Sequence, residues 1–180
     1  MSRIIGGVAG GRRLSMPKGQ ATRPTSDRVR EGLFSSLGGD LAGRAFLDLY
    51  AGSGAVGLEA ASRGATTVVL VERDARAVAT LRSNAAAVGL PNIVVRAEPV
   101  ARFLAEPVVT PFDVVFLDPP YADPVTEVLA LLVERGWLTS DCIVVVERAT
   151  RDGALQWPAG LALDRSRRYG DSTLWYGRRP

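Results

Sequence analysis

Short apolar runs alternate with longer amphipathic stretches over most of the chain. The strongly apolar runs predict strands, which we place at residues 45–49, 66–71, 93–95, 113–117 and 142–146. The intervening stretches carry apolar residues at helical spacing and predict helices at residues 27–37, 54–63, 74–88 and 125–135. Runs this apolar are typical of strands buried on both faces, as in a parallel sheet between two layers of helices. The pattern therefore predicts an α/β fold.

The first residues depart from this alternation. Residues 3–15 alternate around Ala9-Gly10-Gly11, which predicts a small β-hairpin with a glycine turn. The segment is rich in glycine and arginine and short of core residues. We therefore expect it to stay mobile until a partner orders it, and its removal to cost little stability. On this basis residues 1–25 form a basic N-terminal arm and residues 26–180 form the main domain.

The last residues also differ from the central pattern. Apolar residues at 161–163 and 173–176 flank the turn sequence Tyr169-Gly170-Asp171, which predicts an antiparallel hairpin. This hairpin completes a sheet that is otherwise parallel. No repeat or low-complexity linker separates a further domain.

Composition narrows the class of protein. A chain of 180 residues that is 47% hydrophobic can bury one substantial core. No apolar run approaches the roughly 18–20 residues of a membrane span, and the first residues lack an apolar signal region. The single cysteine, Cys142, cannot form an internal disulfide and precedes an apolar run, so we expect a small buried hydrophobe. These features predict a cytoplasmic protein without a membrane partner, and with no interface signal a monomer is expected.

The chain contains no histidine. Ser–His–Asp hydrolysis and histidine proton shuttling are therefore excluded, and the usual zinc sites lose a common ligand. We expect no metal. The chemistry should depend on carboxylates, backbone groups and a reagent that is already activated.

Positive charge is concentrated at the two ends of the chain. Residues 1–30 carry seven basic side chains against the single acid Asp27, whereas the whole chain has a net charge of +3. Segregated charge of this kind favours a polyanionic partner over a merely solvated surface. The candidate nucleic-acid-binding residues are Arg3, Arg12, Arg13, Lys18, Arg23, Arg28 and Arg30. A second candidate cluster near the C-terminus consists of Arg165, Arg167, Arg168, Arg178 and Arg179.

The sequence Asp48-Leu49-Tyr50-Ala51-Gly52-Ser53-Gly54 lies where the first predicted strand of the sheet meets the following helix. Gly52 and Gly54 allow the backbone to turn sharply and to approach a ligand closely. Glu72 ends the second strand, where its carboxylate can accept both hydroxyls of a ribose, and Glu98 follows the third, where it can meet an adenine amine. These positions predict a pocket for an adenosine-containing ligand at the carboxyl edge of the sheet. The candidate pocket residues are Asp48, Tyr50, Ala51, Gly52, Ser53, Gly54, Glu72, Arg73, Ala97, Glu98 and Asp118.

Two ligands of this kind compete. Residues 52–57 match the dinucleotide-binding pattern G-x-G-x-x-G, and Glu72 follows Gly52 at the expected distance. However, Asp48 suits the ammonium of a methionine moiety and would repel a pyrophosphate. The chain also has no room for the substrate domain of a dehydrogenase. We therefore expect S-adenosylmethionine as the cofactor, and an NAD-dependent oxidoreductase is the weaker alternative.

The most informative stretch is Asp118-Pro119-Pro120-Tyr121, which ends the apolar run 114–117. The two prolines remove backbone donors and turn the chain out of the strand, so that a carboxylate, a free carbonyl and an aromatic ring lie close together. The carboxylate and the carbonyl can accept both N–H groups of an exocyclic amine, while the ring of Tyr121 stacks on the base. The stretch therefore predicts a catalytic site that modifies a nucleic-acid base, formed by Asp118, Pro119, Pro120 and Tyr121.

With these motifs the chain resembles the class I S-adenosylmethionine-dependent amino-methyltransferases. More narrowly, it is similar to the bacterial 16S ribosomal RNA guanine-N2 methyltransferases of the RsmD type. The more specific part of the resemblance is the front of the chain, residues 3–14 and Arg23-Pro24-Thr25-Ser26-Asp27-Arg28-Val29-Arg30-Glu31. It continues through residues 57–65 and ends with Tyr169-Gly170-Asp171-Ser172.

The resemblance implies a Rossmann-like fold with a seven-stranded sheet, S-adenosylmethionine as methyl donor and S-adenosylhomocysteine as product. It also implies that the acceptor is the N2 amine of one guanine in 16S rRNA, in an assembled or assembling small ribosomal subunit. A DNA adenine-N6 methyltransferase shares residues 118–121 and is the alternative, although it normally needs a target-recognition segment. A pure RNA-binding module would explain the basic arm but not the cofactor pocket.

Overall fold

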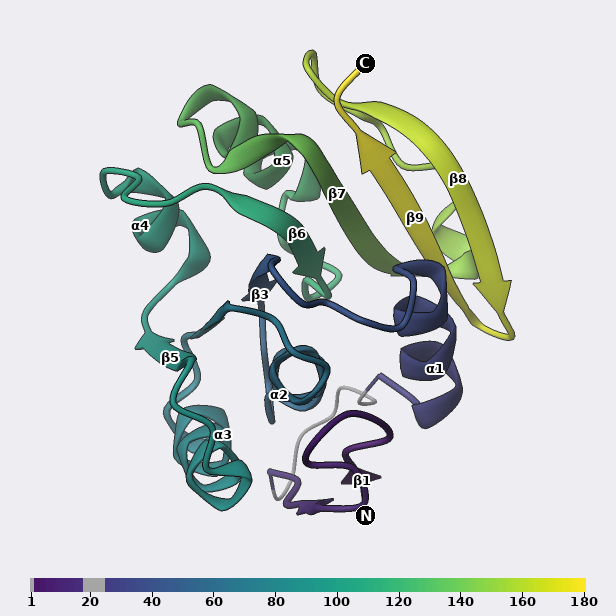
Figure 1. The fold of residues 1–180 in the computed structure, drawn as a ribbon. Coiled ribbons are helices and arrows are strands. Elements are labelled where there is room, and N and C mark those ends of the chain that lie inside the picture. Colours follow the sequence, from purple (N-terminus) through teal and green to yellow (C-terminus); the bar gives the residue numbers. More distant parts are fainter. Residues whose placement is uncertain (1, 18–24) are drawn as a thin grey trace.

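The computed structural model describes residues 2–17 and 25–180, and its centre is a mixed seven-stranded sheet (Figure 1). The strands of this sheet are β3 (Ala45–Leu49), β4 (Thr67–Glu72), β5 (Ile93–Ala97), β6 (Phe112–Leu117), β7 (Leu138–Ala149), β8 (Ala162–Tyr169) and β9 (Ser172–Arg178). Their order is β5-β4-β3-β6-β7-β9-β8, with β9 antiparallel to both neighbours and the pairs from β5 to β7 parallel. The predicted α/β fold with a terminal antiparallel hairpin is confirmed.

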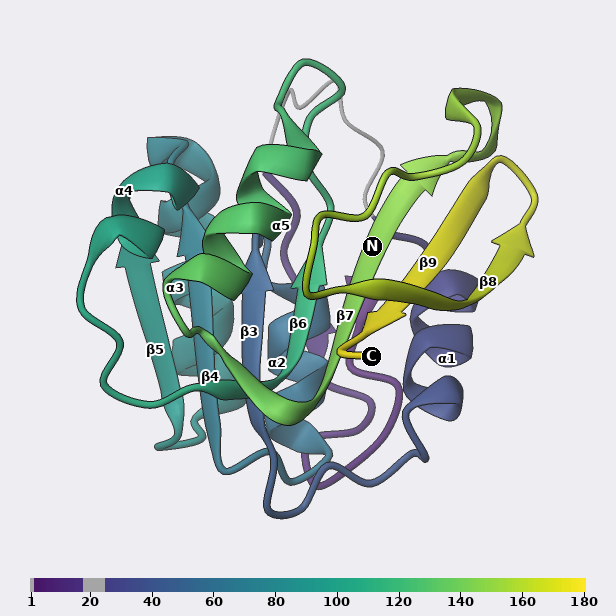
Figure 2. The same ribbon diagram turned by 90° about the horizontal axis from the view of Figure 1, so that it is seen from above.

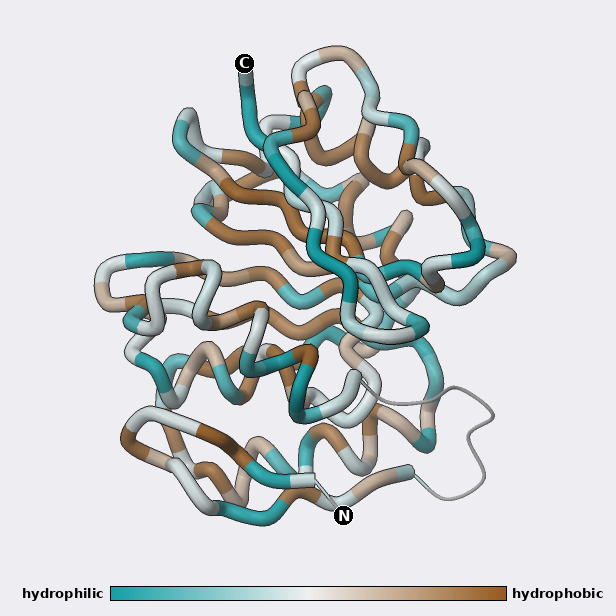
Figure 3. The backbone as a smooth tube through the Cα atoms, turned by 90° about the vertical axis from the view of Figure 1, so that its right-hand side faces the viewer, coloured by the Kyte–Doolittle hydropathy of each residue, from teal (hydrophilic) through white to brown (hydrophobic). Residues whose placement is uncertain are grey.

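Helices cover both faces of the sheet (Figure 2). They are α1 (Asp27–Ser36), α2 (Ala55–Ser62), α3 (Ala75–Val88), α4 (Val100–Ala105) and α5 (Val125–Glu134). Apolar residues of α1, α2 and α3 form one core with one face of the sheet, while α4 and α5 form a second core with the other. Figure 3 shows the hydrophobic central strands between these layers. No helix in residues 2–17 and 25–180 is long and apolar enough to cross a membrane.

Local signals place the helix ends close to their predicted positions. The Ser26 hydroxyl accepts a hydrogen bond from the amide of Val29 and caps α1, and the Asp74 carboxylate caps α3 in the same way. α3 ends at Gly89, which has a positive φ of 69°. Cys142 is buried as predicted.

Four elements differ from the sequence prediction. The short helix α4 was not predicted, because Pro99 and Pro107 bracket a segment that reads as a loop, yet Phe103 and Leu104 bury against the second core. β7 is longer than residues 142–146 because its pairing with β9 extends to Ala149. β8 and β9 likewise extend well beyond the apolar residues that predicted them.

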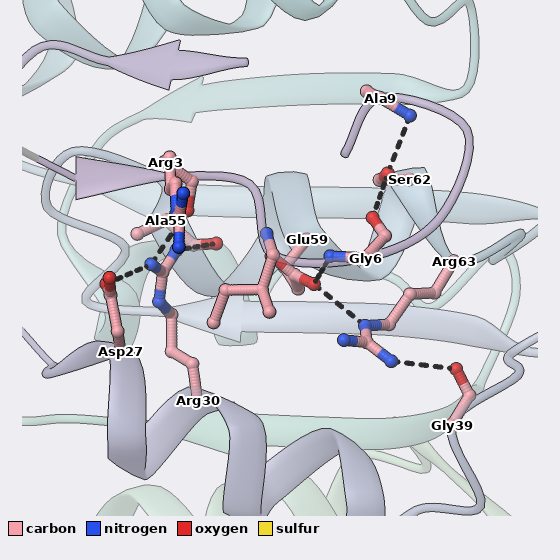
Figure 4. Close-up of polar contacts among 11 residues, drawn as sticks. Arg3, Gly6, Ala9, Asp27, Arg30, Gly39, Ala55, Glu59, Ser62 and Arg63 are labelled. Atoms are coloured by element: carbon pink, nitrogen blue, oxygen red, sulfur yellow. Dashed lines mark hydrogen bonds and ion pairs between the residues drawn. The ribbon is translucent and has the colours of Figure 1, made fainter. Parts of the chain in front are cut away.

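The N-terminal hairpin packs against the main domain. Its strands are β1 (Ser2–Arg3) and β2 (Arg13–Leu14), and Ile4 and Leu14 are buried in the core formed by α1, α2 and α3. The buried Glu59 carboxylate of α2 accepts the amides of Ile5 and Gly6 at 2.7 and 2.8 Å (Figure 4). The expectation that this segment is short of core residues is therefore wrong, since it completes the core of the neighbouring helices.

The strand order reverses between β3 and β6. From β3 the chain continues through β4 to β5 on one side, and then returns to place β6 on the other side of β3. Ligands of open parallel sheets bind at such a reversal, outside the carboxyl ends of the strands. The loops after β3 and β6 carry the two motifs that the sequence singled out, residues 48–54 and 118–121.

Candidate active site

A cleft of about 860 Å³ opens at the carboxyl ends of β3, β4 and β6. Its volume lies within the usual range for small-molecule sites. The predicted site residues that line it are Asp48, Tyr50, Ala51, Ser53, Glu72, Arg73, Asp118, Pro119, Pro120 and Tyr121. Its wall is completed by residues from distant parts of the chain, which are Met16, Thr25, Ala149 and Arg151. We call this the first cleft.

Asp48 is a buried carboxylate in the floor of the first cleft. Its Oδ2 accepts the amide of Gly57 at 2.8 Å. Burial raises the pKa of Asp48 to about 7, the Gly57 hydrogen bond opposes the shift, and the nearby Glu72 carboxylate adds to it. A cationic ligand group would therefore be stabilised at this position.

Glu72 organises the loop that follows β3. One oxygen of its carboxylate accepts the amide of Gly52 at 2.9 Å, and the other accepts the amides of Arg73 and Asp74 at 2.8 Å each. The same carboxylate thus fixes two backbone turns while it faces the first cleft. About one of its four acceptor positions remains free, on the oxygen that accepts Gly52, and a ligand hydroxyl is a suitable partner for it.

The loop itself has a constrained backbone. Tyr50 has a φ of 63°, which non-glycine residues rarely adopt, and such strain is typical of functional sites. Gly54 has a φ of 83°, and a Cβ at this position would lie 2.2 Å from a methyl carbon of Leu81. Glycine is therefore required at residue 54 both for its conformation and for space.

Asn84 of α3 fixes the loop to the N-terminal segment. Its buried side-chain amide donates to the carbonyls of Ser53 and Ser15, at 2.9 and 3.0 Å, and its carbonyl accepts the amide of Ser15. This residue was not predicted from the sequence. Its only signal was a polar side chain among apolar positions of a helix face.

A second cleft, of about 920 Å³, adjoins the first. The residues that line both clefts form their common wall, and they are Asp118, Pro119, Tyr121, Ala149 and Arg151. Tyr121 is 83% exposed, so its ring is available to a ligand. The predicted catalytic motif therefore stands at the junction of the two cavities, which is the position that a group transfer between two ligands requires.

Asp118 and Glu147 are neighbours at this junction. They follow Leu117 and Val146, which are paired in register on the parallel strands β6 and β7. Glu147 lines the second cleft, and its Oε2 accepts the Thr25 hydroxyl at 2.8 Å. Burial raises the pKa of Asp118 well above its usual range, and the Glu147 and Asp48 carboxylates raise it further, against a hydrogen bond from Thr25. Glu147 was not predicted from the sequence, although it follows the apolar run 142–146 just as Asp118 follows the run 114–117.

Four predicted cofactor residues do not line the first cleft. Gly52 and Gly54 lie in the loop whose neighbouring residues line it, and Ala97 and Glu98 precede Pro99, Val100 and Ala101, which form the wall at this point. The Glu98 carboxylate is instead paired with the guanidinium of Arg96 at 2.5 Å and lies 3.7 Å from that of Arg102. Backbone and apolar groups therefore replace the predicted acid on this side of the cleft.

The predicted basic residues separate into different environments. Arg30 is fully buried, and its guanidinium donates to the Asp27 carboxylate and the Arg3 carbonyl (Figure 4). The prediction that it contacts nucleic acid is corrected, because it holds α1 to the N-terminal hairpin. Arg12 donates to the carbonyls of Ala87 and Val88 at the end of α3. Arg3, Arg13 and Arg28 are exposed, whereas Lys18 and Arg23 lie outside the described residues.

Arginines from distant parts of the chain gather around the second cleft. It is lined by Arg28 and Arg168, which the sequence predicted to contact nucleic acid, and by Arg148 within β7 and Arg151 after β7, which it did not. Arg148 lies 3.3 Å from Asp152, while Arg28, Arg151 and Arg168 have exposed side chains. We call these last three the cleft-rim arginines. The second cleft therefore combines an acidic floor with a basic rim.

Comparison with known proteins agrees with this geometry. A family model described as conserved hypothetical protein 95 matches residues 2–178. The chain is 39% identical to the ribosomal RNA small subunit methyltransferase D of Escherichia coli (strain K12), over 92% of this chain and 83% of the relative. It is 35% identical to the putative rRNA methyltransferase YlbH of Bacillus subtilis (strain 168), over 93% of this chain and 94% of that protein.

Solved structures show the same fold. The putative methyltransferase yhhF from Escherichia coli superposes with a TM-score of 0.88 at 36% identity, covering 98% of this chain and 97% of that one. An RNA methyltransferase from Salinibacter ruber, solved with S-adenosyl-L-homocysteine, has a TM-score of 0.66 at 21% identity, covering 86% and 92% of the two chains. At that identity the likeness shows the fold alone.

Fold and site together define a Rossmann-like methyltransferase. The chain belongs to the conserved hypothetical protein 95 family, which is the RsmD-type family of methyltransferases.

Proposed function

We propose that this protein transfers a methyl group from S-adenosylmethionine to the N2 amine of a guanine in 16S rRNA, within an assembled or assembling small ribosomal subunit. The observation that carries the proposal is the position of residues 118–121 on the wall shared by two clefts. The relatives whose names describe ribosomal RNA small subunit methyltransferases support an rRNA substrate.

The first cleft suits a cationic ligand. Its acidic lining residues outnumber its basic ones, and they are Asp48, Glu72, Asp74, Asp118, Asp123 and Glu127. S-adenosylmethionine carries a sulfonium and an ammonium, whereas NAD carries a pyrophosphate that these carboxylates would repel. Asp48 would hold the ammonium and Glu72 the ribose hydroxyls. When bound, S-adenosylmethionine supplies an electrophilic methyl group, so the protein needs no metal or general acid to activate the donor.

The junction of the clefts suits an aromatic amine. The N2 lone pair of guanine is delocalised into the ring, so the amine is a poor nucleophile. Hydrogen bonds from N2 to the Asp118 carboxylate and to the Pro119 carbonyl would hold the nitrogen in line with the methyl group and stabilise its developing positive charge. The exposed ring of Tyr121 would stack on the base.

The basic rim suits the RNA that carries this base. Phosphates are contacted mainly by arginine and lysine, and such contacts position a substrate without reading its sequence. The cleft-rim arginines lie around the second cleft, through which a flipped-out base would reach Asp118. DNA adenine methylation remains the second candidate, because residues 118–121 would serve an adenine N6 amine equally well.

A transfer assay with labelled S-adenosylmethionine tests the proposal. We expect label in small-subunit rRNA, offered naked or as particles, and expect the product after digestion to be N2-methylguanosine by mass spectrometry. Label that enters only DNA, or that is recovered as N6-methyladenosine, would overturn the assignment.

Asp118→Ala tests the catalytic role in the same assay. We expect turnover to fall about 10²–10³-fold, the usual cost of removing one preorganised group that stabilises transition-state charge. Thermal melting should be unchanged or slightly improved, because the variant removes a carboxylate that is repelled by Glu147 and Asp48. The matched control is Asp171→Asn, an exposed carboxylate on the second cleft, which should keep normal turnover. Near-normal turnover of Asp118→Ala would contradict the catalytic role.

A further inference from the structure

Glu147 is a buried carboxylate whose position the fold alone does not explain. Only 7% of its surface is exposed, and its pKa is raised by burial, with hydrogen bonds from Thr25 and Ser172 opposing the shift. Within the described part of the chain no arginine or lysine forms an ion pair with it. Burying an acid without a cation costs free energy, and hydrogen-bond donors offset that cost only where they are present.

The geometry of Glu147 places it beside the catalytic motif. Leu117 of β6 pairs with Val146 of β7, and the next residues along these parallel strands are Asp118 and Glu147. The two acids therefore lie side by side. Both acids line the second cleft. A base whose amine lies against Asp118 would therefore present the adjacent atoms of its edge to Glu147.

The lone pairs of Glu147 define what that edge must carry. A carboxylate offers about four acceptor positions, of which the Thr25 hydroxyl occupies one on Oε2 and Ser172 a further one. Since an ionised carboxylate has no proton to donate, the facing atom must be a donor. In guanine the atom next to the N2 amine on the Watson–Crick edge is the N1–H, a donor. In adenine the atom next to the N6 amine is a bare N1, an acceptor.

We propose that Glu147 is the residue that selects guanine, by accepting the N1–H of the target base while Asp118 and Pro119 accept its N2 amine. The inference rests on the proposed function and deepens it, because it identifies how the same site rejects a base without an N1–H. Adenine would place its N1 lone pair against a carboxylate, and a buried polar pair of that kind is strongly disfavoured.

Base analogues test the contact at the level of one atom. 2,6-Diaminopurine keeps the N2 amine of guanine but has an unprotonated N1 and an amine in place of O6. The substrate is a small-subunit particle reconstituted with rRNA that carries either guanine or 2,6-diaminopurine at the methylated position, and kcat/KM is measured for each. We expect the wild-type protein to prefer guanine by about 10- to 150-fold, the range for a hydrogen bond to a charged group.

Variants then assign the preference to Glu147. In Glu147→Gln the amide can donate to an unprotonated N1, so we expect the preference to fall to within about threefold of unity, mainly through a gain with the analogue. Thr25→Val, which removes the donor that orients Glu147, should reduce the preference partly. Asp171→Asn on the same cleft should leave it unchanged.

The outcomes separate the possible roles. A wild-type preference near unity overturns the inference without any variant, as does a Glu147→Gln protein that keeps the wild-type preference. A structural role alone would lower turnover on both substrates equally and leave the ratio unchanged, which also overturns it. If the wild-type protein methylates neither substrate, the proposed function itself fails, and that result is distinct from the loss of base preference.

Discussion

At the scale of single residues, three carboxyl groups determine what the site can bind. Asp48, Asp118 and Glu147 come from the neighbouring strands β3, β6 and β7, and the pKa of each is raised, above all by burial. Acids whose pKa is strongly shifted are typical of functional sites when they lie in a cleft. They cost the folded protein free energy, and this is recovered when a ligand supplies positive charge or hydrogen-bond donors. A cationic cofactor and a donor-rich base edge together supply both.

Asp48 provides a prediction about pH. A carboxyl whose pKa is raised from 3.8 to about 7 stabilises the folded protein below pH 3.8, and this contribution is lost as the pH rises toward 7. Binding of an ammonium requires the ionised form. We therefore expect the Kd for S-adenosylmethionine to fall by about tenfold per pH unit as the pH rises toward 7, and then to level off. Calorimetry in buffers of different ionisation enthalpy should show release of a proton on binding near pH 6.

Matched variants make this prediction specific to Asp48. Asp48→Asn should bind S-adenosylmethionine weakly and with little dependence on pH between about 5.5 and 7. Asp123→Asn, which removes another acid of the first cleft, should keep the wild-type dependence. A wild-type affinity that does not change over this range would show that Asp48 is already ionised in the free protein, or that it does not face the ammonium.

At the scale of elements, the sequence predicted the parts whose signal is local. The central strands and four of the five helices follow from apolar periodicity and from caps at Ser26, Asp74 and Gly89. α4 was missed because its two flanking prolines resemble loop signals, and its helix is stabilised mainly by burial of Phe103 and Leu104. The lengths of β7, β8 and β9 depend on pairing between distant segments, which no local pattern contains.

The site was predictable to the same extent. Residues 48–54, Glu72 and residues 118–121 each carry their signal within one short segment, and the structure brings them to one cleft. Glu147, Asn84 and Glu59 gain their roles only from residues far away in the sequence. Arg30 was predicted to share a surface with other arginines because they lie close together in the sequence. The fold instead buries its side chain between α1 and the hairpin.

Glu59 provides a prediction about how the N-terminal hairpin is attached. Its buried carboxylate accepts the amides of Ile5 and Gly6 and pairs with the Arg63 guanidinium at 2.8 Å. Glu59→Ala leaves these donors without a partner, so we expect a loss of about 3–5 kcal/mol in the free energy of unfolding. Urea denaturation measures this loss, and hydrogen exchange should show early opening at residues 4–14. The control Glu31→Ala, on the exposed side of α1, should change stability by less than about 0.5 kcal/mol.

If Glu59→Ala were as stable as the wild-type protein, the hydrogen bonds to Glu59 would contribute nothing to the attachment of the hairpin, which would then depend on burial of Ile4 and Leu14. The predicted loss also has a practical consequence. Deletion of the hairpin changes stability and charge together, so it cannot by itself show whether the N-terminal segment binds RNA.

At the scale of the whole molecule, the positive charge that the sequence placed at two ends is redistributed by the fold. Of the described N-terminal arginines, Arg30 is buried and Arg12 is engaged by the end of α3. In the C-terminal cluster the Arg165 guanidinium lies 4.5 Å from the ring centre of Tyr176, and Arg178 lies 3.4 Å from Asp164. Arg28 and Arg168 instead come together with Arg151 around the second cleft. The two ends of the chain thus contribute to one basic rim beside the catalytic motif.

This arrangement predicts which arginines hold the RNA. Each phosphate contact adds about 0.7–0.9 to the slope of log affinity against log salt concentration. Replacing the three cleft-rim arginines, Arg28, Arg151 and Arg168, by alanine should therefore flatten the slope by about 2–3 and weaken binding of RNA.

The exposed hairpin arginines provide the comparison. Replacing Arg3 and Arg13 by alanine should flatten the slope by less than about 2. Both variants change exposed side chains, so melting should stay close to wild type. The Kd for S-adenosylmethionine should stay close to wild type in the hairpin variant, which changes no residue of the first cleft. A salt titration of rRNA binding on the three proteins decides between the surfaces: a rim variant with the wild-type slope, beside a hairpin variant with a flattened one, would place the RNA on the N-terminal hairpin instead.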